Sequence, residues 1–84
     1  MTERPGELSG TDGPELRGAL NLAVARNLRR LRKEMGLSQD GFERHTGLHR
    51  TYASAIERGQ KNLTLRSVER LATKLGVDPL DLLR

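Results

Sequence analysis

Residues 38–58 decide the fold, and they run SQDGFERHTGLHRTYASAIER. Ser38 is a good helix N-cap, Phe42 supplies an apolar anchor, and Gly47 ends this first short helix. After a brief turn, a second helix continues to about Arg58. Two short helices joined by a glycine-containing turn are typical of the unit that lays one helix across a DNA backbone and the next in the major groove. The same spacing also fits a structural corner in a small helical bundle, so both interpretations stay open here.

Helical spacing continues on both sides of this pair. Upstream, apolar residues recur on one helix face at Leu16, Leu20, Val24, Leu28, Leu31 and Met35. Downstream, Thr64 caps a helix that Gly76 stops, and Asp78 followed by Pro79 opens a last short helix. The pattern predicts an all-α fold, a compact bundle of five helices, with residues 15–84 forming one domain.

The composition suits a small helical domain. The chain has 84 residues, one Phe, one Tyr and neither Trp nor Cys, so its core is aliphatic and lacks disulfides and thiolate metal sites. Residues 1–14 are rich in Gly, Pro and acids, and we expect them to form a disordered acidic tail. No apolar run approaches the ~20 residues that span a bilayer, and no signal-peptide core is visible. We therefore expect a cytoplasmic protein without membrane contact.

Charge and histidine placement limit the function classes. The net charge of +4 supports a polyanionic partner without proving one, and most of the basic run 26–33 is assigned to a solvated helix face. His45 and His49 form no recognised catalytic spacing with nearby Ser or Asp residues. The turn at Gly47 also separates them from the shared helix face that a metal pair needs. We expect neither an enzyme nor a bound cofactor or metal.

Three stretches together resemble the lambda-repressor and Cro type of helix-turn-helix domain, the Xre family. They are NLRRLRKEMGLSQ (27–39), TGLHRTYASAIERG (46–59) and TLRSVERLATKLGVDPL (64–80). The runs LHRTY (48–52), IERG (56–59) and KNLT (61–64) are most similar to the controller proteins of restriction–modification systems. The resemblance extends over about residues 22–83.

The resemblance implies a sequence-specific transcriptional regulator that binds double-stranded DNA as a homodimer on a pseudo-palindromic operator and controls its own promoter region. It also implies higher-order assembly on tandem operators and contact with RNA polymerase. A phage or plasmid repressor, or an antitoxin-type autoregulator, is the alternative within this class. A helical bundle that binds only other proteins is the alternative outside it, and it predicts no salt-sensitive DNA binding.

The second helix of the pair carries most residues that the resemblance assigns to DNA. Arg50 falls at its start, where the planar guanidinium matches guanine O6 and N7; the alternative is a solvated helix start. The residues expected at base edges are Arg50, Thr51, Ser54, His49 and Ala55. The residues expected at phosphates are Gln39, Tyr52, Arg58, Lys61 and Asn62. Lys61 fits a solvated loop charge equally well.

Two further groups have structural roles. Arg32 and Glu57 match family positions that pair, which predicts an ion pair between the first helix and the recognition helix. The terminal helix carries more apolar surface than it can bury alone, so we expect a dimer interface at Leu80, Leu82 and Leu83.

Several positions depart from the family pattern, among them Gly41, which stands in a helix interior where an acid is common. Glu43 replaces a usual Ala, and Ala53 replaces a usual Ile or Val, so the smaller residue makes room for the larger; the Glu43 carboxylate then has to be hydrated or paired. His49 occupies the N-cap position of the recognition helix, where a ring nitrogen either caps the helix or turns toward DNA.

Overall fold

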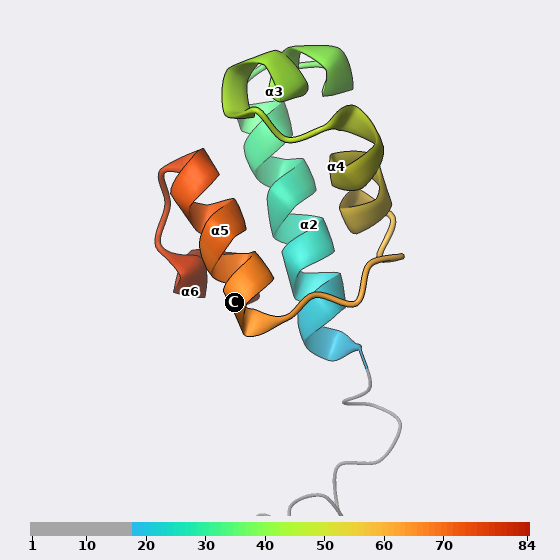
Figure 1. The fold of residues 1–84 in the computed structure, drawn as a ribbon, viewed down its shortest axis with the longest axis vertical. Helices are drawn as coiled ribbons and strands as arrows, with labels where there is room; N and C mark the ends of the chain where they lie inside the picture. Colours follow the sequence, from blue (N-terminus) through green and yellow to red (C-terminus); the bar gives the residue numbers. More distant parts are fainter. Residues whose placement is uncertain (1–17) are drawn as a thin grey trace, which may run out of the picture.

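A computed structural model describes residues 18–84, which form five α-helices (Figure 1). The helices are α2 (Ala19–Glu34), α3 (Gln39–Thr46), α4 (Arg50–Glu57), α5 (Leu65–Leu75) and α6 (Pro79–Leu83). The all-α class and the five helices expected from the sequence are confirmed for this part of the chain. The expected acidic tail, residues 1–14, lies outside the described residues.

The longest helix, α2, runs through the middle of the bundle (Figure 1). It contacts α4 on one side and α6 on the other, while α3 packs on α4 and α5 packs on α6. The largest fully buried side chains are Val24, Leu28, Phe42, Ile56, Leu71 and Leu82. All five helices contribute to this list, so one shared core holds the two short helices, α3 and α4, in place.

Side-chain caps define where the short helices begin. Ser38 Oγ accepts a hydrogen bond from the Gly41 amide at 3.0 Å, as its position in the sequence predicts. Thr64 caps α5 and Asp78 caps α6 in the same way. The turn between α3 and α4 requires a left-handed residue, and Gly47 supplies it with φ of 80°.

A buried asparagine fastens the terminal helix to α2. Asn27, 5% exposed, donates hydrogen bonds from Nδ2 to the carbonyl oxygens of Leu82 at 2.9 Å and Arg84 at 3.1 Å. This docking corrects one expectation from the sequence, because Leu82 is completely buried in its own core and Leu83 packs against that core. Leu82 is therefore not available to a second copy of the chain, and of the three leucines only Leu80 is exposed.

None of the helices between residues 18 and 84 is both long and apolar enough to cross a membrane.

Candidate nucleic-acid interface

A shallow hollow of about 190 Å³ lies where α3 and α4 meet. Its lining residues are Gln39, Arg50, Thr51, Ser54 and Arg58. Half of the ten side chains expected at DNA from the sequence thus come together on one surface. Gln39 reaches it from the first residue of α3, whereas the others come from α4 and its C-cap.

The start of α4 is held by two side chains that bond to backbone amides. His49 Nδ1 accepts a hydrogen bond from the Thr51 amide at 3.0 Å, so His49 acts as the N-cap and its Nε2 carries the ring proton. Glu43 Oε1 accepts from the Arg50 amide at 3.1 Å. The Glu43 carboxylate, which replaces the family's usual Ala, is therefore paired, and it helps to fix the first residue of α4.

The Arg50 side chain has a partner that the sequence did not single out. Its Nη1 lies 2.6 Å from Asp40 Oδ1, which comes from the first turn of α3. Both side chains are more than half exposed, at 55% for Arg50 and 58% for Asp40. The pair joins residues ten apart in sequence, and only the angle between α3 and α4 brings them together. No local pattern in the sequence indicates it.

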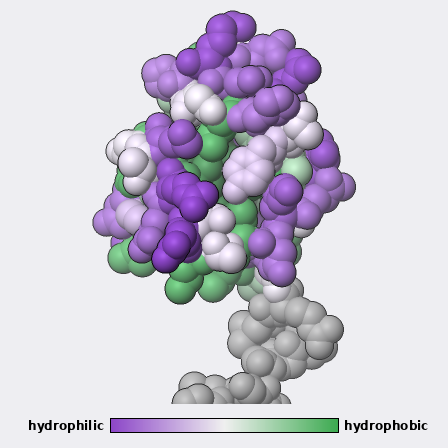
Figure 2. Space-filling model, viewed as in Figure 1, coloured by the Kyte–Doolittle hydropathy of each residue, from purple (hydrophilic) through white to green (hydrophobic). Residues whose placement is uncertain are grey.

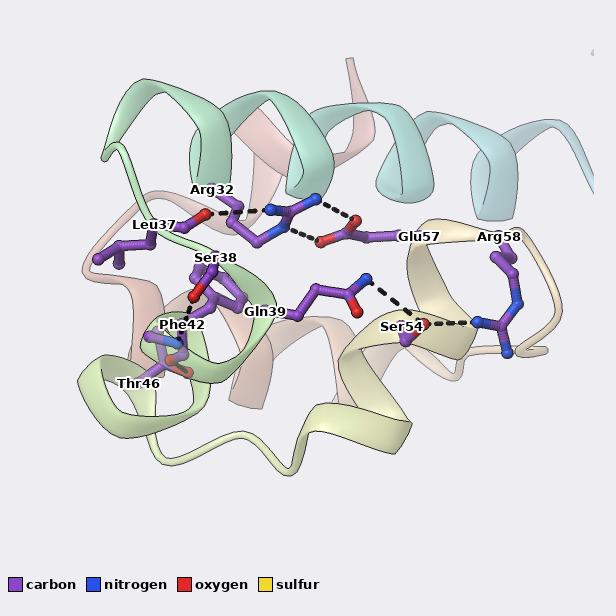
Figure 3. A network of polar contacts seen from close by, with 10 residues as sticks. Arg32, Leu37, Ser38, Gln39, Phe42, Thr46, Ser54, Glu57 and Arg58 are labelled. Atoms are coloured by element: carbon purple, nitrogen blue, oxygen red, sulfur yellow. Dashed lines mark hydrogen bonds and ion pairs between the residues drawn. The ribbon is translucent and has the colours of Figure 1, made fainter.

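Ser54 joins the two helices at the other side of the hollow (Figure 3). Its hydroxyl accepts a hydrogen bond from Arg58 Nη1 at 2.5 Å and a long one from Gln39 Nε2 at 3.5 Å. Arg58 also donates from Nε to Gln60 Oε1 at 3.1 Å. In the free protein, Ser54 therefore orients two neighbours that the sequence assigns to phosphates.

The remaining expected contacts lie outside this hollow. Lys61 Nζ sits 5.5 Å from the centre of the Tyr52 ring, a cation–π distance. Tyr52 also lines a second hollow of about 250 Å³, between α4 and α5. Asn62 Oδ1 accepts from Asn21 Nδ2 at 3.1 Å, and Ala55 is half-buried.

Arg32 on α2 and Glu57 on α4 form an ion pair that lies between the two helices (Figure 3). Arg32 Nε donates to Glu57 Oε2 at 2.7 Å, Nη2 donates to Oε1 at 3.0 Å, and Nη1 donates to the Leu37 carbonyl at 3.0 Å. The side chains are only 13% and 4% exposed. The hydrogen bonds that Arg32 donates to the Glu57 carboxylate raise the pKa of Arg32, an effect that burial partly opposes. The ion pair predicted from the sequence is present, and neither of its side chains lines the hollow.

Comparison with known proteins gives consistent matches. A family model described as helix-turn-helix, HTH_3, matches residues 28–82. The chain is 42% identical over 64 residues to a hypothetical transcription factor of Neisseria meningitidis serogroup B, covering 76% of this chain and 60% of that protein. It is 38% identical over 65 residues to control protein C.BamHI of Bacillus amyloliquefaciens, covering 76% of this chain and 80% of the relative.

A solved structure agrees with these sequence matches. The restriction-modification controller protein C.AhdI from Aeromonas hydrophila superposes with a TM-score of 0.61 at 39% identity, over 74% of this chain and 94% of that one. The chain thus spans less than two thirds of the Neisseria relative's length but most of the two controller proteins.

Proposed function

Because the chain belongs to the HTH_3 helix-turn-helix family, we propose that it is a transcriptional regulator that binds double-stranded DNA with the start of α4. The observation that carries this proposal is the hollow beside the start of α3 in which α4 and its C-cap present two arginines, Arg50 and Arg58, on one exposed surface. Guanidinium groups suit both guanine edges and phosphates. A structural corner between two helices has no need of either side chain at that surface.

We assign base recognition to the first turns of α4. Arg50 stands at the helix start and offers its planar fork to guanine O6 and N7. Thr51, exposed beside it, supplies a methyl group and a hydroxyl to the adjacent base pair. Ser54, Ala55 and the Nε2–H of His49 complete the base-facing set.

We assign the phosphate contacts to residues on both sides of this set. Gln39 lies at the N-terminus of α3, where amide groups favour a phosphate. Arg58 lies at the C-terminal end of α4 and provides a charged contact. Lys61, held over the ring of Tyr52, and Asn62 extend the contact along the backbone. Such contacts give affinity and register but carry no sequence information.

The proposal for the kind of regulator is supported by relatives of the chain, several of which are named as control proteins. We propose an autoregulatory controller of a restriction–modification system that acts in the cytoplasm on its own promoter region. Occupation of tandem operators there would bring more than one dimer together and place them beside RNA polymerase. A toxin gene next to this gene, in place of restriction and methylation genes, would favour the antitoxin-type alternative.

The proposed dimer uses the end of the molecule where apolar surface is exposed. Leu80 on α6 is 56% exposed and Leu65 at the start of α5 is 73% exposed. α6 returns alongside the first half of α5, and hydrophobic surface gathers at this lower edge (Figures 1 and 2). A two-fold axis through it would place two α4 helices about 34 Å apart, one DNA turn, on a pseudo-palindromic site.

A titration tests the proposed function. A labelled duplex from the region upstream of the chain's own gene is compared with a scrambled duplex of the same composition over a series of salt concentrations. We expect the upstream duplex to bind at least ~10³-fold more tightly, with salt-sensitive affinity for both. Salt-insensitive or absent binding to both duplexes would favour the protein-interaction alternative.

A further inference from the structure

Two acidic side chains of α3 bind Arg50, one at its guanidinium group and the other at its backbone amide. Asp40 Oδ1 lies 2.6 Å from Nη1 of the guanidinium, and Glu43 Oε1 accepts from the Arg50 backbone amide at 3.1 Å. Asp40 and Glu43 share one face of α3 because they stand one helical turn apart. We propose that Asp40 is a positioning residue that sets the base preference of Arg50. This inference rests on the DNA-binding function proposed above.

Because its backbone amide and its guanidinium are both hydrogen-bonded, Arg50 is already oriented before it contacts a base. A free arginine side chain loses much rotamer freedom when it binds, and this loss weakens binding. Here the Glu43 bond fixes the backbone and the Asp40 bond fixes the direction of the guanidinium before DNA arrives. A guanidinium has five N–H donors, so engagement of Nη1 by Asp40 leaves donors for both O6 and N7 of a guanine.

The Asp40 charge also selects the kind of acceptor that Arg50 meets. A carboxylate beside the guanidinium repels a phosphate but has a much weaker effect on the neutral edge of a guanine. Arg58, in the same hollow, gives the contrast: its hydrogen bonds go to the neutral side chains of Ser54 and Gln60. Among residues 18–84, no carboxylate forms an ion pair with Arg58. The two arginines are thus equipped for different acceptors, Arg50 for a base and Arg58 for a phosphate.

Stability does not account for the Asp40–Arg50 pair. Both side chains are more than half exposed, and solvent-exposed ion pairs contribute little to folding. The effect of removing the Asp40 charge is therefore expected in DNA selectivity and not in the melting temperature.

The test selects binding sites from a pool of randomised duplexes. The wild-type chain, Arg50→Ala, Asp40→Asn, the double variant and Glu34→Gln are each carried through selection, and the base preference at every position is counted. Glu34→Gln is the matched control, because it removes one exposed carboxylate paired with an arginine at 3.3 Å on a surface away from α4. Melting of each variant is recorded alongside.

We expect Arg50→Ala to lose the preference for one base pair, and Asp40→Asn to weaken that same preference by about 3- to 10-fold. Asp40→Asn should also bind scrambled duplexes more tightly, and the double variant should match Arg50→Ala in its preference. Glu34→Gln should keep the full preference. Unchanged preference in Asp40→Asn, or a loss at a different base pair from that of Arg50→Ala, would overturn the positioning role. If the wild-type chain enriches no sequence, the proposed function itself fails and the positioning role fails with it.

Discussion

Arg32 of α2 and Glu57 of α4 are joined by two parallel hydrogen bonds, of 2.7 and 3.0 Å, in an ion pair that is almost wholly buried. The same guanidinium donates to the Leu37 carbonyl in the loop before α3. One side chain therefore connects α2, α4 and the entry to α3, and it fixes the geometry of the helix pair without using the exposed surface. Arg32 has a structural role, in contrast to the DNA contacts proposed for Arg50 and Arg58.

Loss of Glu57 should destabilise the fold strongly. Glu57→Ala leaves the Arg32 charge buried without its partner, so we expect the free energy of unfolding to fall by about 3 kcal/mol, a large part of the stability of a small domain. The matched control, Glu34→Ala, breaks an exposed pair with Arg30 and should cost less than ~1 kcal/mol. Urea denaturation followed by circular dichroism measures both variants. Equal small losses would show that the Arg32–Glu57 pair contributes no more than a surface pair.

The same pair should be insensitive to moderately alkaline pH. A base whose pKa is raised by folding contributes stability that is present below its unfolded pKa and is lost only as pH rises through its folded pKa. Because the pKa of Arg32 is raised from an already high value, both limits lie far above neutral pH. The unfolding free-energy difference between wild type and Glu57→Ala should therefore be equal at about pH 7 and about pH 9. A difference that shrinks with rising pH would contradict this account of Arg32.

Asn27 should contribute to the stability of the fold, although it lies within the basic run 26–33 of α2. Asn27→Ala removes the side-chain donor to the buried Leu82 carbonyl oxygen and one of the two donors to the Arg84 main-chain oxygen, the other being Arg26 Nη2 at 3.2 Å. We expect a loss of about 1–3 kcal/mol in unfolding free energy. Asn62→Ala, which removes an exposed amide, serves as the control. If the two substitutions cost the same, the docking of α6 does not depend on Asn27.

Dimerisation should depend on the exposed Leu80. Leu82 is buried in its own protomer and should make no contact with the partner. Sedimentation equilibrium at micromolar concentration should show a dimer for the wild type and a monomer for Leu80→Glu. Met35→Glu, at an exposed apolar residue at the opposite end of α2, should remain dimeric. A wild-type chain that stays monomeric with and without DNA would rule out the proposed dimer.

The helices were predictable because their signals are local. Ser38, Thr64 and Asp78 each cap a helix as their positions in the sequence predict, and Gly47 takes the left-handed turn that its place requires. The Arg32–Glu57 pair was anticipated only through the family resemblance, since its members stand 25 residues apart.

The features that the sequence did not predict depend on how the helices pack. Leu80 and Leu82 look alike as part of an apolar terminal helix, yet docking of α6 on α2 exposes the first and buries the second. The Asp40–Arg50 contact likewise exists only because α3 and α4 meet at their particular angle. Nothing in the sequence indicates that an acid and a base ten residues apart, such as Asp40 and Arg50, form an ion pair.

The central claim is that Arg50 recognises a base, whereas Arg58 and Gln39 contact the DNA backbone. Titrations on two duplexes distinguish these two kinds of contact. Wild type, Arg50→Ala, Arg58→Ala and Gln39→Ala are titrated at several salt concentrations on a duplex that the wild type has selected from a random pool and on its scrambled counterpart. Arg50→Ala should lose ~1–3 kcal/mol of binding free energy on the selected duplex and little on the scrambled one. Arg58→Ala should weaken both and lower the log–log salt slope by about one, while uncharged Gln39 should leave that slope nearly unchanged. Equal losses on both duplexes for Arg50→Ala would make Arg50 a phosphate ligand, and no loss on either would contradict the assignment of α4 as the recognition helix.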